Sequence, residues 1–326
     1  MRQRWKRPAC WRRCLPCWAQ WIVWRRPSQP GRKVRIISAV GASGTVSAMS
    51  TTGTDPLAFD WHLHTTASDG RATATEMDAM ARSLGRSIGT SEHVLMDNRR
   101  LRTVTQLRAH VQSVRDLGLP VGAEISVGDP TDAARVAFDS GVFTDFDYVI
   151  ASLHQVDVPQ GRVQSDRYLN WRYGLFPRYV PNVVDLDRAA YFDTWLAALN
   201  DTLRRVPVTI LGHFALAPEL ARPGGDVESS TDPGLDPIPD AEAGAWLDAT
   251  IDLCVTHNVA IELNAKSRVP HADFIARAMR RGARFTLGSD AHSLDRAGDI
   301  AFGLAVARTQ AIPADRFLTP PLARRS

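Results

Sequence analysis

Leu57-Ala58-Phe59-Asp60-Trp61-His62-Leu63-His64 is a short apolar run that ends in histidines and carries an acid. The same arrangement recurs along the chain as far as Ser289-Asp290-Ala291-His292. The clusters between them are Ser68-Asp69-Gly70, Ser91-Glu92-His93, Gly122-Ala123-Glu124-Ile125, Ser152-Leu153-His154 and Gly212-His213. Six of the nine histidines fall inside these clusters, and unrelated core histidines have no reason to pair repeatedly with acids. The pattern indicates a multinuclear metal site.

From Leu57 onward, short apolar runs alternate with longer helical patterns, which is the rhythm of βα units. Thr73 and Glu76 predict a capping box for a helix that ends at Gly85, and a second helix ends at Gly118. Further helices are predicted at 191–205, 241–257 and 271–281, and strands at 57–62, 87–90, 120–126, 147–152, 206–211, 259–263 and 283–288. Two long segments interrupt the pattern, residues 155–186 and 217–240. The rhythm predicts an α/β fold, and a single α/β barrel fits the length of 326 residues.

The proposed metal ligands follow the predicted strands. In a closed α/β barrel, the carboxyl ends of the strands meet at one rim, where the reactive residues gather. Imidazole and carboxylate suit Zn, Mn and Fe, and the absence of cysteine from the set argues against a structural zinc site. The residues at or just beyond a strand end are His62, Glu124, His154, His213 and Asp290.

Residues 1–48 differ in composition from the rest of the chain. They hold 11 of the 39 Lys and Arg residues and none of the 35 acids, so the remainder has 28 basic and 35 acidic residues and a net charge of −7. We interpret 1–48 as a basic Trp/Arg-rich extension, either disordered or upstream of a true start at Met49, and 49–326 as the functional domain. The apolar run 18–24 is too short to span a bilayer, so no membrane association is expected. The acidic body favours a small substrate over a stable nucleic-acid partner.

Cysteine usage indicates a reducing compartment. Cys10, Cys14 and Cys17 lie in the extension, and Cys14-x-x-Cys17 lacks the second pair of a zinc ribbon. Cys254 lies on an apolar helix face and is predicted to be a small buried hydrophobe. A single cysteine in the body implies no disulfide framework, and we expect a cytoplasmic protein.

The order of the motifs resembles that of the PHP family, the polymerase and histidinol phosphatase superfamily. Its motifs look like D-x-H-x-H, S-D-G, an x-x-H after the second strand, G-x-E, S-x-H, G-H and a closing S-D-A-H, and the resemblance covers roughly residues 57–300. It implies a distorted (β/α)7 TIM-like barrel with the metal site at the C-terminal rim of the strands. It also implies two to three divalent metal ions, Zn, Mn or Fe.

By the resemblance, one ion would be held by His62, His64, Glu124 and Asp290. Glu124 would bridge to a second ion held by His93 and His154. A third ion would be held by Asp69, His213 and His292. Glu124, Asp290 and His292 are also the expected catalytic residues.

Two acids beside these ligands are given other roles. Asp60 is expected to orient His62 or to anchor the strand end. Many family members carry T-D-H-D at the second motif, whereas this chain has Ser91-Glu92-His93-Val94. Glu92 is expected to be a solvated loop acid.

Such a cluster suits phosphoester hydrolysis. Ions about 3.5 to 4 Å apart share a bridging hydroxide and clamp the attacking and leaving oxygens at phosphorus. The chain has no Gly-x-Ser-x-Gly, and Gly41-Ala42-Ser43-Gly44 lacks the Lys of a phosphate loop. The sequence therefore predicts a metal-dependent phosphomonoesterase.

Within the family, the chain looks most like the stand-alone histidinol-phosphatase branch. The likeness rests on Tyr191-Phe192-Asp193 and on Ile261-Glu262-Leu263-Asn264 followed by Arg268. It implies L-histidinol phosphate as the substrate and a role in histidine biosynthesis. Arg268 is the expected phosphate-binding residue, and Lys266 is its rival. Phe214 stands where the branch usually has Pro, so the substrate can differ.

Two other functions remain open. One is a nucleotide or oligonucleotide phosphoesterase, in which Arg162, Arg167 and Arg172 interleave with Tyr168, Trp171 and Tyr173 as a base-stacking platform. The same residues would equally suit a lid, with Arg167 contacting the substrate, or a surface loop. The other is a non-catalytic binding module. The sequence leaves the oligomeric state open.

Overall fold

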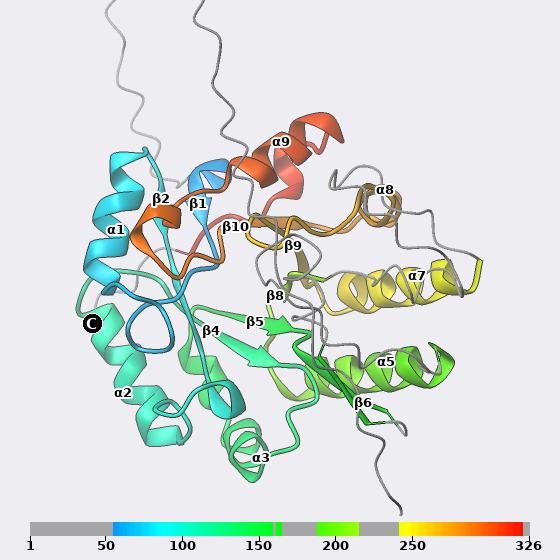
Figure 1. Ribbon diagram of the computed structural model, residues 1–326, viewed down its shortest axis with the longest axis horizontal. Coiled ribbons are helices and arrows are strands. Elements are labelled where there is room, and N and C mark those ends of the chain that lie inside the picture. Colours follow the sequence, from blue (N-terminus) through cyan, green and yellow to red (C-terminus); the bar gives the residue numbers. More distant parts are fainter. Residues whose placement is uncertain (1–54, 159–160, 165–187, 215–240, 322–326) are drawn as a thin grey trace, which may run out of the picture. The chain divides into compact units, whose positions relative to one another are not determined.

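The computed structural model describes residues 55–158, 161–164, 188–214 and 241–321. The predicted extension 1–48, most of the predicted segment 155–186, and the insertion 217–240 lie outside these ranges, as does Arg167. In Figure 1 the described residues are coloured along the sequence from blue to red.

A parallel sheet of six strands forms the centre of the described chain, in the order β10-β9-β8-β5-β4-β3. The strands are β3 (Thr90–His93), β4 (Val121–Ser126), β5 (Tyr148–Ser152), β8 (Ile210–Gly212), β9 (Ala260–Asn264) and β10 (Phe285–Gly288). Every residue of the last five strands is buried. Such continuous burial is typical of a parallel sheet with both faces covered, and it explains why the strands read as apolar runs rather than as alternating patterns.

The sheet curls so that its two edges approach the same segment of chain. β1 (Phe59–Asp60) pairs in parallel with β2 (Ser87–Ile88). Just beyond β1, the N–H of Trp61 donates to the carbonyl of Leu287 over 2.9 Å, and the N–H of Ser91 donates to the carbonyl of Leu63 over 3.0 Å. The predicted α/β class is confirmed, and the curled sheet is consistent with a TIM-like barrel. The count of seven βα units remains a prediction.

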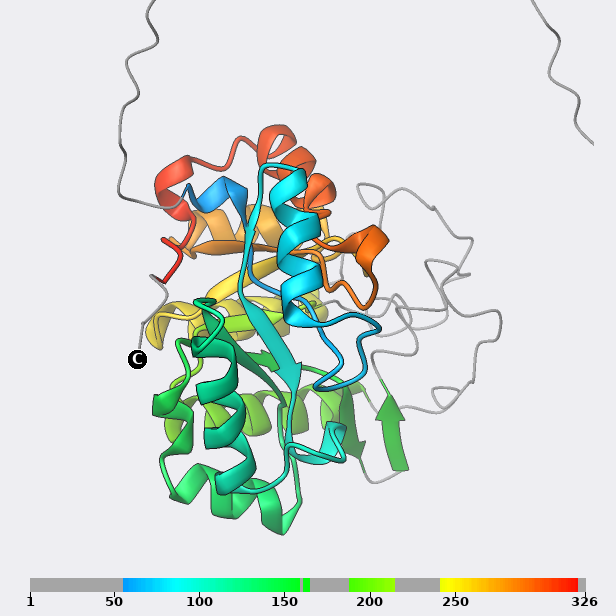
Figure 2. The ribbon, with the colours of Figure 1, turned by 90° about the vertical axis from the view of Figure 1, so that its left-hand side faces the viewer.

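Helices cover the outside of the curled sheet (Figures 1 and 2). They are α1 (Ala74–Ser83), α2 (Val104–Arg115), α3 (Asp132–Asp139), α5 (Arg188–Arg205), α7 (Ala241–Thr256), α8 (Ala272–Arg280) and α9 (Ala301–Thr309). α8 shows why they pack this way, because its buried Phe274, Ile275 and Ala278 recur at helical spacing on one face. The capping box predicted at Thr73 and Glu76 is present at the start of α1.

Several elements differ from the sequence prediction. The predicted strand 87–90 is divided between β2 and β3 at Gly89, where a Cβ would lie 2.5 Å from the Tyr148 hydroxyl. β8 is shorter than predicted because Pro207 has no N–H to donate to a sheet. The antiparallel hairpin of β6 (Gln155–Val158) and β7 (Gly161–Gln164) lies in a segment predicted to be irregular. The helices α3 and α9 lie in segments for which no helix was predicted from the sequence.

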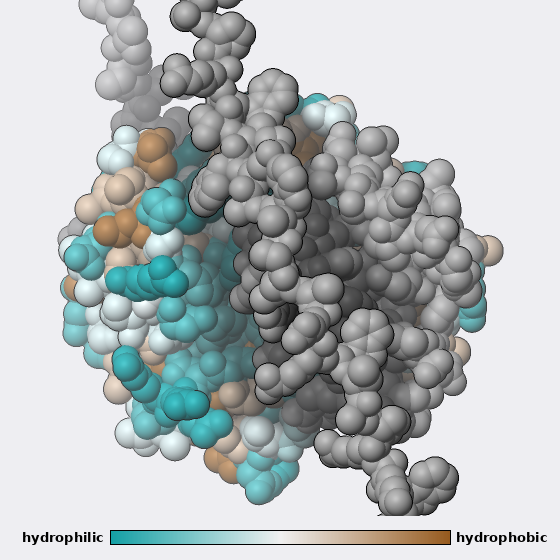
Figure 3. Space-filling view, viewed as in Figure 1, coloured by the Kyte–Doolittle hydropathy of each residue, from teal (hydrophilic) through white to brown (hydrophobic). Residues whose placement is uncertain are grey.

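Cys254 is fully buried in the main hydrophobic core, as predicted. Its burial raises the pKa of the thiol to about 12. In the described ranges, no helix is both long and apolar enough to cross a membrane. Hydrophilic residues predominate on the described part of the face seen in Figure 3, where Figure 1 places α1 and α2.

Candidate metal centre

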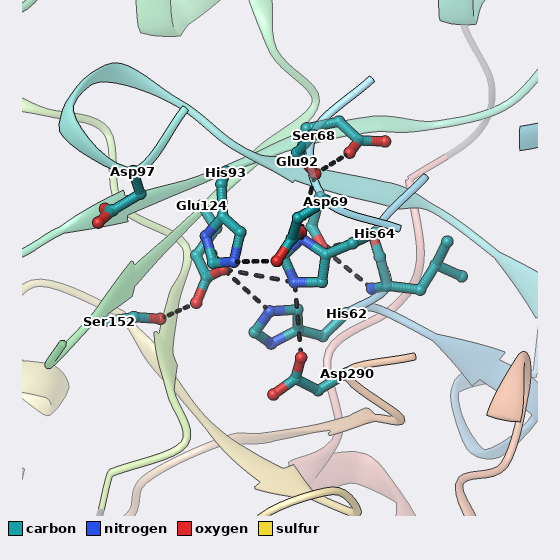
Figure 4. Close-up of polar contacts among 12 residues, drawn as sticks. His62, His64, Ser68, Asp69, Glu92, His93, Asp97, Glu124, Ser152 and Asp290 are labelled. Carbon is teal, nitrogen blue, oxygen red and sulfur yellow. Dashed lines mark hydrogen bonds and ion pairs between the residues drawn. The ribbon is translucent and has the colours of Figure 1, made fainter. Parts of the chain in front are cut away.

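The ends of the parallel strands bring the predicted metal ligands together. His93 is the last residue of β3, His213 directly follows β8, and Asp290 comes two residues after β10. Figure 4 shows His62, His64, Glu124 and Asp290 directed toward one another, with Asp69 and His93 beside them. Contacts of 2.8 to 3.8 Å connect the whole set of nine residues. These nine are His62, His64, Asp69, His93, Glu124, His154, His213, Asp290 and His292.

Glu124 is the centre of this set and is fully buried. Its Oε2 atom lies 3.4 Å from the Nε2 atoms of both His62 and His64. Its Oε1 atom lies 3.3 Å from Nε2 of His154 and 3.1 Å from Nε2 of His213. One carboxylate therefore faces imidazoles on two sides, which is the geometry of a bridging ligand.

The potential ligand atoms form four groups, and within each group they lie within 4.8 Å of one another. The groups are His62, His64 and Asp290; Glu124, His154 and His213; His64, Asp69, His93 and His292; and His93, Asp97 and His154. The ion assignment drawn from the family resemblance stays a prediction. His93 lies with His154, as that assignment expects, whereas His213 lies with Glu124 and His154 rather than with Asp69 and His292. β8 neighbours β5, so His213 emerges beside His154, and Nε2 of His93 also faces the carboxylate of Asp69 at 3.8 Å.

The residues of this cluster fit divalent ions. Three of their buried ring nitrogens have no hydrogen-bond partner among the described residues: Nε2 of His62 and both ring nitrogens of His64. Buried polar atoms without partners are costly and rare in folded proteins. A cation coordinated by these nitrogens would satisfy them, and the mixture of imidazole and carboxylate in the cluster suits Zn, Mn or Fe.

The electrostatics keep the acids ready to bind a cation. Burial raises the pKa of Glu124, but His93, His62 and His154 outweigh burial and hold that pKa well below its usual value. Burial likewise raises the pKa of Asp290, and Lys266 and His62 bring it well below the ordinary value. Both carboxyls are therefore ionised at neutral pH, as ligation requires.

The central histidine is kept neutral. Burial, aided by the neighbouring His93, lowers the pKa of His64 well below its usual value. Neutral imidazole is the form that binds a metal ion. His64 contributes to two of the four groups, so its neutral state matters for both.

Asp60 anchors the strand ends, as expected. Its carboxylate accepts the backbone N–H groups of His62 at 3.2 Å, Ser289 at 2.9 Å and Gly298 at 3.1 Å. Full burial is the largest influence on this carboxyl and raises its pKa to about 6. Asp60 therefore ties the segment after β1 to the segment after β10.

The expectation for Glu92 is wrong. Glu92 is fully buried rather than solvated. Its carboxylate accepts the N–H of Thr65 at 3.1 Å and the hydroxyl of Thr65 at 2.6 Å, and it also accepts the hydroxyl of Ser68. Glu92 lies within β3 rather than in the loop that follows it. The loop that carries Asp69 covers the Glu92 side chain through Thr65 and Ser68.

Two further carboxylates contact the imidazoles of this cluster, and the sequence analysis gave neither of them this role. Oδ2 of Asp97 lies 3.4 Å from Nδ1 of His154, and Ser126 contacts the same nitrogen at 2.7 Å. Oε1 of Glu262 lies 2.7 Å from Nδ1 of His62. Carboxylates in such positions orient imidazole ligands. Glu262 carries a sequence signal, because an acid inside the apolar strand Ile261-Glu262-Leu263 requires a buried partner.

Of the three predicted substrate-binding residues, the structure places one at the cluster. Nζ of Lys266 lies 3.0 Å from Oδ1 of Asp290 and 3.4 Å from Nδ1 of His292, so the structure places it at the cluster. Arg268 is exposed two residues further on, with a φ of 54°. Arg167 lies outside the described residues.

Comparison with family models and with curated proteins found no match. Among solved structures, the chain is similar to a Listeria monocytogenes protein that is described provisionally as a histidinol phosphatase. The TM-score is 0.52 at 13% sequence identity, and the match covers 74% of this chain and 97% of the other. At this identity the likeness shows a shared fold alone.

Proposed function

We propose that the chain is a metal-dependent phosphomonoesterase, a hydrolase of phosphoric ester bonds. The observation that carries the proposal is the cluster that Glu124 forms with eight other histidines and acids, in which buried ring nitrogens have no hydrogen-bond partner among the described residues. The fold shared with a protein described as a histidinol phosphatase supports the same reaction class. Divalent ions held here would supply positive charge to phosphate oxygens and lower the pKa of a water molecule.

Three groups of side chains would hold the ions. His62, His64 and Asp290 form one, Glu124 contributes to a second, and Asp69 contributes to a third. We propose Glu124, Asp290 and His292 as the residues at the reacting centre. The Ser152 hydroxyl donates to Oε1 of Glu124 over 2.5 Å and so fixes the orientation of the shared carboxylate.

Exposure indicates the side from which a substrate would approach. The side chains of His62, His64 and Glu124 are fully buried. Asp69 is 55% exposed and His292 is 23% exposed. A phosphate ester would therefore reach the group that contains Asp69 and His292 first.

Lys266 lies on this open side and is 33% exposed. It is also the only lysine after residue 33, in a chain whose other basic residues there are all arginine. An ammonium group is a compact charge with three donors, which suits the oxygens of a phosphoryl group. We propose that Lys266 binds the substrate phosphate, with Arg268 on the same loop as a second candidate and Arg167 as a third.

L-Histidinol phosphate is the proposed substrate, on the strength of the motif resemblance. The test is phosphate release by the purified protein, supplied with Mn or Zn, from L-histidinol phosphate, nucleoside monophosphates, a nucleoside bisphosphate and an aryl phosphate. A preference of orders of magnitude for L-histidinol phosphate supports the proposal. Inactivity on every phosphate ester, despite bound metal, contradicts it.

One observation favours the alternative of a nucleotide phosphoesterase. Arg99, Arg100 and Arg102 are exposed on the loop after β3, and Arg100 donates to the carbonyl of Thr66 over 3.0 Å, on the loop that carries Asp69. Positive charge beside the open side of the cluster suits a substrate with a second phosphate. Preference for the nucleoside bisphosphate in the same assay would favour this alternative.

A further inference from the structure

Glu262 is a fully buried acid in the middle of β9 whose carboxylate contacts two proposed ligands. Its Oε1 atom lies 2.7 Å from Nδ1 of His62, and its Oε2 atom accepts the backbone N–H of His213 at 2.6 Å. These two ligands belong to different groups, since His62 lies with His64 and His213 lies with Glu124. One carboxylate therefore contacts ligands of two neighbouring ion positions.

The contact with His62 determines which ring nitrogen is available. An ionised carboxylate only accepts hydrogen bonds, so Nδ1 of His62 must carry the proton. The other nitrogen, Nε2, faces Oε2 of Glu124 at 3.4 Å and has no hydrogen-bond partner in the part of the chain that the structure describes. This arrangement leaves Nε2 as the nitrogen directed toward a cation, as expected for an imidazole ligand oriented by a carboxylate.

The contact with His213 supports an unusual backbone conformation. His213 has a φ of 24°, which residues with a side chain rarely adopt. Such a conformation persists only when its surroundings hold it. The N–H of His213 points at Oε2 of Glu262, and this bond fixes the peptide that directs the imidazole toward Glu124.

The neighbouring strand leaves room for the carboxylate. A Cβ at Gly288 of β10 would collide with Oε1 of Glu262 and lie 2.8 Å from Cβ of His62. Glycine at this position is therefore required for Glu262 and His62 to meet. The contact is built into the packing of two strands rather than formed by chance at a surface.

We propose that Glu262 is a positioning residue that sets two metal ligands at once, holding His62 in its Nδ1–H form and His213 in its strained backbone conformation. The proposal rests on the proposed metal-dependent function and deepens it. Glu262 lies outside the four ligand groups and acts through the two histidines. Its loss should weaken both ion positions together.

Glu262→Gln is the informative substitution because it keeps the size of the side chain. A glutamine amide has one accepting oxygen and one donating NH2 group. It can accept from His62 or from His213, but its NH2 group then faces the other donor. We expect the affinity for metal ions to fall about 10- to 100-fold.

Thr286→Val provides the matched control. Thr286 of β10 is the register partner of Glu262, is buried, and has a hydroxyl without a hydrogen-bond partner in the described structure. This substitution removes a buried polar atom beside Glu262 without changing any proposed ligand. We expect it to leave metal affinity and stoichiometry unchanged.

The experiment is equilibrium dialysis of the full chain against Mn or Zn, with metal analysis, and with thermal unfolding of each metal-free protein measured in parallel. Weakened binding at two positions in Glu262→Gln, in a protein that still unfolds cooperatively, supports the proposal. Unchanged binding in Glu262→Gln overturns it. If the wild-type protein binds neither metal, the proposed function itself fails, which is a separate result.

A measurement on the wild-type protein decides the question even if the variant does not fold. The zinc-loaded chain, labelled with 15N at histidine, reports by NMR which ring nitrogen of His62 carries a proton. A proton on Nδ1, with Nε2 bound to zinc, is the expected result. An unprotonated Nδ1 would overturn the proposal.

Discussion

His93 of β3 and Glu124 of β4 are register partners in the parallel sheet, and Nδ1 of His93 lies 2.8 Å from Oε2 of Glu124. The pairing of two strands therefore sets the distance between two of the proposed ligands. Ligands held by strands are placed more accurately than ligands held by loops. This relationship explains why a shared carboxylate can occupy the centre of the cluster.

Replacing Glu124 should abolish activity while leaving the fold intact. Glu124→Gln keeps the shape of the side chain but removes the charge that faces the surrounding imidazoles, so we expect kcat/KM to fall by about 1,000-fold or more. Phosphate release and bound metal are the measurements. Glu76→Gln, at an exposed helix cap where glutamine also serves, is the control. Full activity in Glu124→Gln would refute the shared-ligand arrangement.

Removing metal should lower thermal stability. Bound cations satisfy buried atoms that otherwise have no partner, and a ligand present at 100 times its Kd stabilises a folded protein by about 2.7 kcal/mol. For a domain of this size, that corresponds to a fall in Tm of roughly 5 to 10 °C after chelation. Calorimetry in the presence of EDTA, and again after metal is restored, measures this change in Tm. An identical Tm in both states, for a protein shown to bind metal, would contradict the prediction.

Lys266 should contribute to substrate binding rather than to metal binding. Losing a charge-assisted hydrogen bond costs about 1.5 to 3 kcal/mol, so Lys266→Met should lower kcat/KM by about 10- to 150-fold. Lys266→Arg should restore part of this loss, because it keeps the charge but changes the geometry. Steady-state kinetics and metal analysis of both variants test this. If Lys266→Met lost metal without any change in kcat/KM per bound ion, the role of Lys266 would instead be to support the metal ligands.

Cys254 should be inert in the folded protein. Burial raises the pKa of its thiol from 9.0 to about 12, so the reactive thiolate is scarce at pH 8. Because the folded-state pKa lies above the unfolded value, the stability linked to this thiol is complete below pH 9 and is lost as the pH rises toward 12. A chain with Cys10, Cys14 and Cys17 replaced by Ser should react with a thiol reagent only after unfolding. Rapid reaction of the folded chain at pH 8 would show that the core around Cys254 opens to solvent.

The sequence predicted those parts of the fold that depend on local patterns. The capping box at Thr73 and Glu76 is a short-range signal, and the structure confirms it. The break at Gly89 depends on the ring of Tyr148, which is distant in sequence. A contact of this kind leaves no local trace, so strand boundaries could not be predicted as well as the strands themselves.

The candidate site shows the same division. Motif spacing predicted the nine residues that converge, because each lies in a parallel strand or in the segment that follows one. Their grouping could not be predicted, since it depends on the neighbours of each strand: His213 lies with His154, and His93 lies both with Asp69 and with His154. The prediction for Glu92 was wrong for a similar reason. The loop that buries Glu92 contributes Thr65 and Ser68, which are distant from Glu92 in sequence.

Metal content and phosphate release, measured on the same preparation, test the proposed metal-dependent hydrolysis most directly. The full chain would be assayed with L-histidinol phosphate as purified, after EDTA treatment, and after Mn or Zn is restored. We expect bound metal, hydrolysis that chelation abolishes, and recovery when the ion returns. Hydrolysis that survives complete removal of metal, or a protein that binds no divalent ion, would contradict it.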